Sequence, residues 1–151
     1  MSDSAPAGAA PATSNDKAVR VVGIVVAVLG ALFLIAGIVT YAVISSTLAD
    51  EKIVVSDDAD HFAGKDVTGP FTAYAQADVI NKHALEIGGG KTYAELPQDD
   101  PNRDTVMTAT FLQASLFTSV VAFGVAAFVA VMGVILMMLG WVLLRLTRRT
   151  T

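Results

Sequence analysis

The sequence predicts an all-α membrane protein: a two-helix transmembrane hairpin with a small, mainly helical extracytoplasmic domain packed on the extended stem of the second helix. Two runs without any charged residue lead to this prediction, Val21 to Ile44 and Thr105 to Leu144. Each exceeds the roughly 20 residues that an α-helix needs to cross the hydrocarbon core of a bilayer. The mean hydropathy of +0.60 is also high for a soluble domain of 151 residues.

The order of polar and apolar segments divides the chain into five parts. Residues 1–18 are rich in Ala, Pro, Ser and Thr, and we expect them to form a disordered cytoplasmic tail. The other parts are transmembrane helix 1 (19–49), an acidic extracytoplasmic domain (50–104), a long helix that includes transmembrane helix 2 (105–147) and a cytoplasmic tail (148–151). The first apolar run has 24 residues, whereas the apolar region of a signal peptide has about 7–15. This length favours a retained anchor over cleavage near Ala49.

Basic residues flank both apolar runs and orient them. Lys17 and Arg20 precede the first run, and Arg145, Arg148 and Arg149 follow the second. Because Lys and Arg near the ends of spans stay in the cytoplasm, we expect both termini inside the plasma membrane and the middle segment outside. The middle segment carries twelve acidic residues against five Lys or Arg, a balance that disfavours binding to nucleic acid.

The middle segment contains the pattern of one amphipathic helix. Gly69-Pro70 marks its start, and Gly88-Gly89-Gly90 marks its end. One face collects apolar side chains at helical spacing, namely Ala73, Ala77, Ile80, Ala84 and Ile87. Upstream of this helix, Lys52 to Ser56 has the composition of a short strand.

The second apolar run is too long for the bilayer. As a helix, its 40 residues would extend about 60 Å, roughly twice the hydrocarbon thickness. Its first quarter is rich in Thr, so we expect this part to project outside the membrane as a stem. Met107, Phe111 and Ala114 form an apolar stripe on the stem, and the amphipathic helix is expected to pack there. A floppy acidic loop is the alternative.

Small residues recur every seven positions on both apolar runs. The first run carries Gly23, Gly30 and Gly37, and the second carries Ser119, Ala126, Gly133 and Gly140. Small residues let helix backbones approach closely in lipid, and a seven-residue period favours a left-handed crossing. The two stripes therefore predict close contact between the spans. The alternatives are that one stripe serves a homo-oligomer, or that glycine and alanine are simply common in membrane helices.

Several classes of chemistry lack the residues that they need. The chain has no cysteine, which excludes disulfides, thiolate metal ligands and cysteine nucleophiles. It has no P-loop, dinucleotide-binding or EF-hand pattern. Neither apolar run holds an ionisable residue, and such residues usually mark transport paths through a membrane. We expect no cofactor.

Leu48 to Phe123 resembles a group of small actinobacterial two-span membrane proteins. The matching strings are LADEKI from Leu48, FAGK from Phe62, GPFTAYAQA from Gly69, HALE from His83, GGKTYAE from Gly89, DDP from Asp99 and TVMTA from Thr105. The resemblance from Leu48 to Phe123 covers about half of the chain, including the whole middle segment. Members of this group are often named aromatic ring-opening dioxygenases. The resemblance thus implies either that activity or a non-catalytic helical subunit.

The number of histidines argues against the enzyme. Extradiol ring-opening enzymes hold non-haem iron with two histidines and a carboxylate. This chain has two histidines, His61 and His83, with Asp60 and Glu86 among the nearby acids. An iron site would use both histidines and leave none as the acid or base of the reaction. We expect no catalytic residue and no metal, and these four residues are the weak candidates for metal ligands.

The sequence as a whole predicts a non-enzymatic integral membrane protein that serves as an accessory or scaffolding interaction subunit of a cell-envelope complex. Its expected partners are the lipid bilayer and either another membrane protein or a second copy of the chain. The alternative is an extracytoplasmic ligand-binding, metal-binding or dioxygenase-related domain anchored by two spans. A third class is an oligomeric channel.

Overall fold

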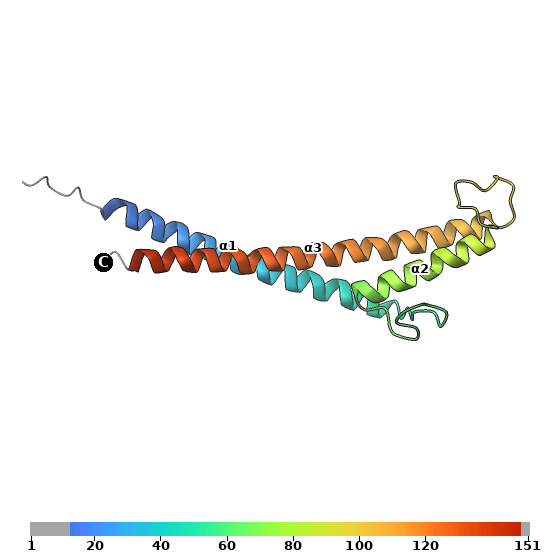
Figure 1. Cartoon of the computed structure of the whole chain (residues 1–151), viewed down its shortest axis with the longest axis horizontal. Helices are drawn as coiled ribbons and strands as arrows, with labels where there is room; N and C mark the ends of the chain where they lie inside the picture. The colour runs from blue at the N-terminus through green and yellow to red at the C-terminus, as the bar shows by residue number, and fades with distance from the viewer. Residues whose placement is uncertain (1–12, 149–151) are drawn as a thin grey trace, which may run out of the picture. The chain divides into compact units, whose positions relative to one another are not determined.

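The computed structural model describes residues 13–148 of the chain. Three helices form in this range, α1 (Thr13–Asp50), α2 (Pro70–Ile87) and α3 (Arg103–Arg148), and Figure 1 shows them in chain order. No strand forms within residues 13–148, so the all-helical class is confirmed. α1 and α3 are each long and apolar enough to cross a membrane. The predicted tails fall outside the described residues at 1–12 and 149–151.

The two long helices extend beyond their predicted ends. α1 begins at Thr13, so the last six residues of the predicted disordered tail are helical instead. Asp16 lies in the first turn of α1, where a carboxylate stabilises the positive end of the helix dipole. α3 begins at Arg103, two residues before the predicted start, and Asp104 lies in its first turn.

The bounds of α2 follow from local sequence signals. Pro70 occupies the first turn, and the Gly69 N–H donates to Thr72 Oγ1 at 3.2 Å. At the other end, the Gly88 N–H donates to the Ala84 carbonyl at 2.9 Å, and the Gly90 N–H donates to the Leu85 carbonyl at 2.7 Å. Gly90 has a φ of +82°, a conformation that glycine adopts without strain. The prediction of a helix that starts at Pro70 and stops at the three glycines is confirmed.

The expected strand at Lys52 to Ser56 is wrong. This segment forms one isolated antiparallel bridge, between Val54 and Asp66. The Val55 N–H donates to the Lys65 carbonyl at 2.9 Å, but the next amide, that of Ser56, donates to the side chain of Gln76 at 2.9 Å. A side chain of α2 therefore takes the place of the partner strand, and the ladder stops.

The contacts divide the chain into two compact units. The terminal unit combines residues up to Ile35 with residues from Val131 onward, and the central unit is Ala36–Ala130. α1 and α3 contribute to both units. The central unit holds one apolar cluster that includes Leu48, Val67 and Phe123, and a second formed by Ala84, Leu96 and Val106. Both clusters combine residues from α3 with residues from α2 and its flanking loops.

The face of α3 that joins these clusters is not the predicted one. Val106, Leu116 and Phe123 are buried. Phe111 from the predicted stripe is 65% exposed, and Ala114 is exposed as well. Consecutive residues of a helix differ by about 100° in direction, so a shift of one position moves the packed face away from Phe111. On α2, Ala73, Ala77 and Ala84 are buried as predicted, whereas Ile87 is exposed.

Candidate functional site

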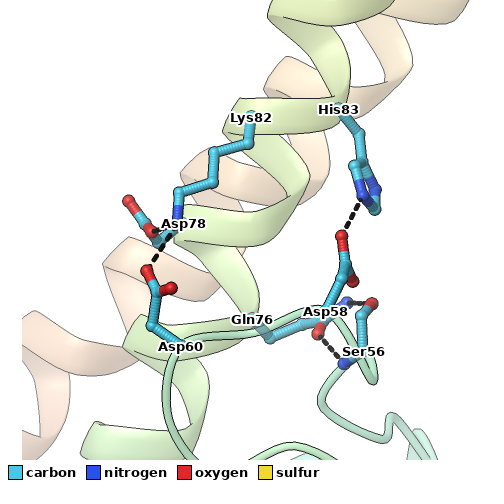
Figure 2. A network of polar contacts seen from close by, with 7 residues as sticks. All are labelled: Ser56, Asp58, Asp60, Gln76, Asp78, Lys82 and His83. Atoms are coloured by element: carbon cyan, nitrogen blue, oxygen red, sulfur yellow. Dashed lines mark hydrogen bonds and ion pairs between the residues drawn. The ribbon is translucent and has the colours of Figure 1, made fainter.

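A set of ion pairs fastens the acidic loop after α1 to the outer face of α2. His83 Nε2 lies 2.6 Å from Asp58 Oδ2, and Lys82 Nζ lies 2.7 Å from Asp60 Oδ2. Lys82 also contacts Asp78, one helical turn earlier, at 3.1 Å. Figure 2 shows the loop passing in front of α2 with Asp58 and Asp60 directed at the two neighbouring helix residues. We call these five residues the clasp.

The charges of the clasp favour its paired form. The hydrogen bond from His83 is the main cause that lowers the pKa of Asp58 below its ordinary value of 3.8. The hydrogen bond from Lys82 lowers the pKa of Asp60 in the same way. Asp60 and Asp78 raise the pKa of Lys82 from 10.5 to about 12. All of these side chains are between 45% and 75% exposed, so water screens the pairs and each contributes little to stability.

Gln76 is a positioning residue of the clasp that the sequence analysis missed. Its side chain is buried, its Oε1 accepts the Ser56 N–H at 2.9 Å, and its Nε2 lies 3.5 Å from Ser56 Oγ. Figure 2 shows it at the base of the loop that bears Asp58. The available signal was its place between Ala73 and Ala77, a polar residue on an otherwise apolar helical face. Such a residue needs a hydrogen-bond partner once it is buried.

The four candidate metal ligands do not come together. His83 is paired with Asp58, and Asp60 is paired with Lys82. The His61 ring lies edge-on to the Phe62 ring, with centroids 6.4 Å apart. Within residues 13–148, no group of three or more His, Asp or Glu side chains is arranged to hold a metal ion. This part of the chain therefore offers no two-histidine, one-carboxylate site of the kind that binds non-haem iron.

An open apolar groove lies between α2 and α3 in the central unit. Its volume is about 520 Å³, and its lining includes Ile80, Ala84 and Ile87 from α2 and Thr108, Ala109 and Leu112 from α3. Leu112 is 53% exposed, and its neighbour Phe111 is more exposed still. The central unit thus leaves large apolar side chains uncovered along the first part of α3.

The predicted small residues bring the backbones of α1 and α3 close together in each unit. In the terminal unit, a Cβ added to Gly30 would lie 2.7 Å from the Gly133 carbonyl oxygen, and one added to Gly140 would lie 2.7 Å from the Gly23 carbonyl oxygen. In the central unit, a Cβ on Gly37 would lie 2.7 Å from the Ala126 carbonyl oxygen. Separations below 3.0 Å do not occur between real Cβ atoms and backbone, so no larger residue fits at these glycines.

Ser119, the first residue of the second stripe, is hydrogen-bonded within its own helix. Its hydroxyl donates to the Ser115 carbonyl within α3 at 3.2 Å. This bond satisfies the hydroxyl inside its own helix, as Ser and Thr often do in apolar surroundings. The other six predicted packing residues lie at close approaches of α1 and α3.

Comparisons with known proteins give no guide to the role of these sites. No protein-family model matches the chain, and it has no significant match among curated proteins or solved structures. The function has to be argued from the groove, the clasp and the two apolar helices.

Proposed function

We propose that this chain is a non-enzymatic integral membrane protein that crosses the plasma membrane as a helical hairpin and serves as an accessory interaction subunit of an envelope complex. In this proposal both termini are cytoplasmic and residues 50–104 are outside. The alternative of a metal-binding or dioxygenase-related domain has less support, because His83 and Asp60 are already paired with other side chains.

The exposure of the two long helices supports membrane insertion. In the most apolar part of each of these helices, only 17% of the residues are buried within the chain. An exposed apolar surface of this extent is not stable in water, whereas lipid covers it at no cost. Trp141 and Arg145 add a second argument. The Arg145 guanidinium lies 4.1 Å from the centre of the Trp141 ring. Tryptophan favours either edge of a bilayer, and arginine favours the cytoplasmic side.

The groove between α2 and α3 is the observation on which the interaction role rests. Tyr41 and Phe123 are in ring contact at 4.7 Å, and the apolar run of α1 ends three residues later, at Ile44, before Ser45 and Ser46. A similar distance along α3, counted from Phe123 toward its N-terminus, leads to about Ser119. Leu112 then lies seven residues further out, about 10 Å beyond the apolar run of α1. Lipid does not cover a groove at that height, so its exposed apolar side chains are available to a protein.

Thiol labelling tests the topology. The chain has no cysteine, so single cysteines can be read without background. On intact cells, an impermeant thiol reagent should label Ala94→Cys, at an exposed position in the loop before α3. It should not label Ala7→Cys, at a position beyond the described residues. The reverse pattern would overturn the orientation and the assignment of the groove to the outside.

Photo-crosslinking in living cells tests the interaction. A photoreactive residue at position 112 should yield a discrete adduct with a protein. Leu139 is the matched control, because it is the same residue type and is 52% exposed, against 53% for Leu112. Unlike Leu112, it lies on the part of α3 that the proposal places inside the membrane. A probe at position 139 should yield lipid adducts. If the probe at position 112 forms no protein adduct, the interaction role is wrong. An adduct of the chain with itself would identify a second copy as the partner.

A further inference from the structure

Two contacts fix the level of the first turn of α2 within the central unit. The Ser45 hydroxyl donates to the Thr68 carbonyl at 2.7 Å. The Tyr74 and Phe117 rings meet edge to face, with centroids 5.7 Å apart. Ser45 directly follows the apolar run of α1, and Phe117 lies about two residues before the matching point on α3. α2 therefore begins at the level where the long helices would leave the hydrocarbon core.

Aromatic side chains gather at this level without cover from the central unit. Phe71, in the first turn of α2, is 73% exposed, the highest exposure of any large apolar side chain in the described chain, and Tyr74 is 54% exposed. Phe62 reaches the same place from the tip of the acidic loop, and all three residues line one shallow cavity of about 260 Å³. Aromatic rings of this kind concentrate at the boundary between lipid and water.

The clasp pairs carboxylates of the loop that carries Phe62 with side chains of α2. Asp58 and Asp60 are paired with His83 and Lys82, which lie about three turns further along α2 than Phe71. At 1.5 Å per residue, the separation along the helix is roughly 18 Å. Figure 2 shows both acids beside the middle of α2. Asp60 and Asp78 line the same cavity as the three rings, and both are paired with Lys82, so these carboxylates stand beside the rings as members of ion pairs.

We propose that Phe62, Phe71 and Tyr74 form an interfacial anchor that enters the headgroup region of the outer leaflet. The occupant of this aromatic face is lipid, because the face continues the exposed apolar surface of α1 and α3 at the point where that surface ends. The anchor would hold the start of α2 on the membrane and so set the height of the groove above it. This inference rests on the proposed membrane hairpin.

Single-tryptophan fluorescence in phosphatidylcholine vesicles tests the anchor. Trp141 is the only tryptophan, so Trp141→Phe provides a silent background in which Phe71→Trp is made in the full chain. The emission of this variant should shift to shorter wavelength. A spin label near the carbonyl end of the acyl chain should quench it more strongly than a label near the methyl end. Phe128→Trp, within the apolar run, should show the opposite preference.

Phe111→Trp is the matched control in the same background. Phe111 is as exposed as Phe128, at 65%. It lies on the first part of α3, before Ser119, which projects outside the proposed membrane, so neither lipid label should quench this variant. The anchor is overturned if the Phe71→Trp variant behaves like the Phe111→Trp variant. It is also overturned if the Phe71→Trp emission is blue-shifted without lipid quenching, since that result indicates contact with protein. The native Trp141 separates the two proposals: if lipid labels fail to quench it, the chain is not inserted and the hairpin itself is wrong.

Discussion

The terminal and central units differ in the residue types that they bury. Every large or medium apolar side chain that is buried among those the structure describes, from Leu48 to Phe123, belongs to the central unit. In the described part of the terminal unit, the buried residues are four glycines, Gly23, Gly30, Gly133 and Gly140. The central unit therefore has a core of the kind that the hydrophobic effect stabilises in water. The described part of the terminal unit instead has close contacts at its glycines, of the kind that stabilises helix pairs in lipid.

This difference is what the proposed membrane hairpin leads us to expect. In lipid the surroundings are as apolar as the side chains, so burial of a leucine gains nothing and close glycine contacts hold helices together. In water, burial of large apolar side chains is favourable. The four predictions below test this contrast, from the largest expected effect to the smallest.

Phe123→Ala should destabilise the central unit most. The Phe123 side chain is 1% exposed and contacts Tyr41, and truncation of such a ring costs about 4 kcal/mol. Hydrogen exchange of the backbone amides in residues 36–130 should accelerate strongly. Phe128→Ala is the control, because Phe128 is mostly exposed on the same helix and its loss should leave exchange unchanged. Equal effects from the two variants would contradict the assigned core.

Gly30→Leu should separate the helices of the terminal unit. A Cβ at this position would lie 2.6 Å from the Met137 backbone nitrogen, and overpacking of this kind costs about 3 kcal/mol. The reporter is a disulfide between Gly23→Cys and Leu143→Cys, whose Cβ atoms would lie 3.2 Å apart, close to disulfide geometry. Cross-linking should be lost in Gly30→Leu and retained in Ile135→Leu, at an exposed position. Unchanged cross-linking in Gly30→Leu would rule out this interface.

Gln76→Leu should loosen the acidic loop without unfolding α2. The change leaves the Ser56 N–H without its acceptor, and an unpaired, partly buried amide costs about 1–2 kcal/mol. The exchange of the Ser56 amide should rise, while the amides of the Ala84 and Val106 cluster should stay protected. Asn81→Leu, on the same helix, is the control. If the Ser56 amide exchanges as slowly in Gln76→Leu as in the parent, the loop does not depend on this side chain.

Asp58, Asp60 and Lys82 of the clasp should respond to pH at the extremes. Asp58 and Asp60 have pKa values below 3.8 in the folded chain, so their stabilising effect is complete above pH 3.8 and is lost as the pH falls through the lowered values. The pKa of Lys82 is raised from 10.5 to about 12, so its contribution is complete below pH 10.5 and is lost as the pH rises through about 12.

Because the clasp is exposed, this is the smallest of the four effects. NMR shifts of the amides of Asp58 to Asp60 should follow the acid transition, and Asp60→Asn should weaken it. A transition of equal size in Asp60→Asn would show that the pair with Lys82 does not contribute. The same titration should leave cross-linking in the terminal unit unchanged, since the described part of that unit contains no clasp residue.

Local sequence signals were enough for some elements. Gly69-Pro70 and the three glycines after Ile87 predicted the bounds of α2 correctly, because helix start and stop depend on residues within one turn. The absence of charge predicted the two long helices, but not their ends. The strand expected at Lys52 to Ser56 failed because its partner for hydrogen bonding was Gln76, 20 residues away. No local pattern contains that information.

The sequence by itself determined that this chain has two helices able to cross a membrane, with small residues at a seven-residue spacing on each. Hydrophobicity and glycine spacing are properties of single segments, so they can be read without the fold. Only the tertiary structure decided which face of α3 is packed, that Asp58 and Asp60 pair with His83 and Lys82, and that Phe71 stays exposed beside the end of the apolar run of α1. These features depend on how segments far apart in the chain meet. A helical pattern in the sequence does not determine how each helix is rotated about its own axis.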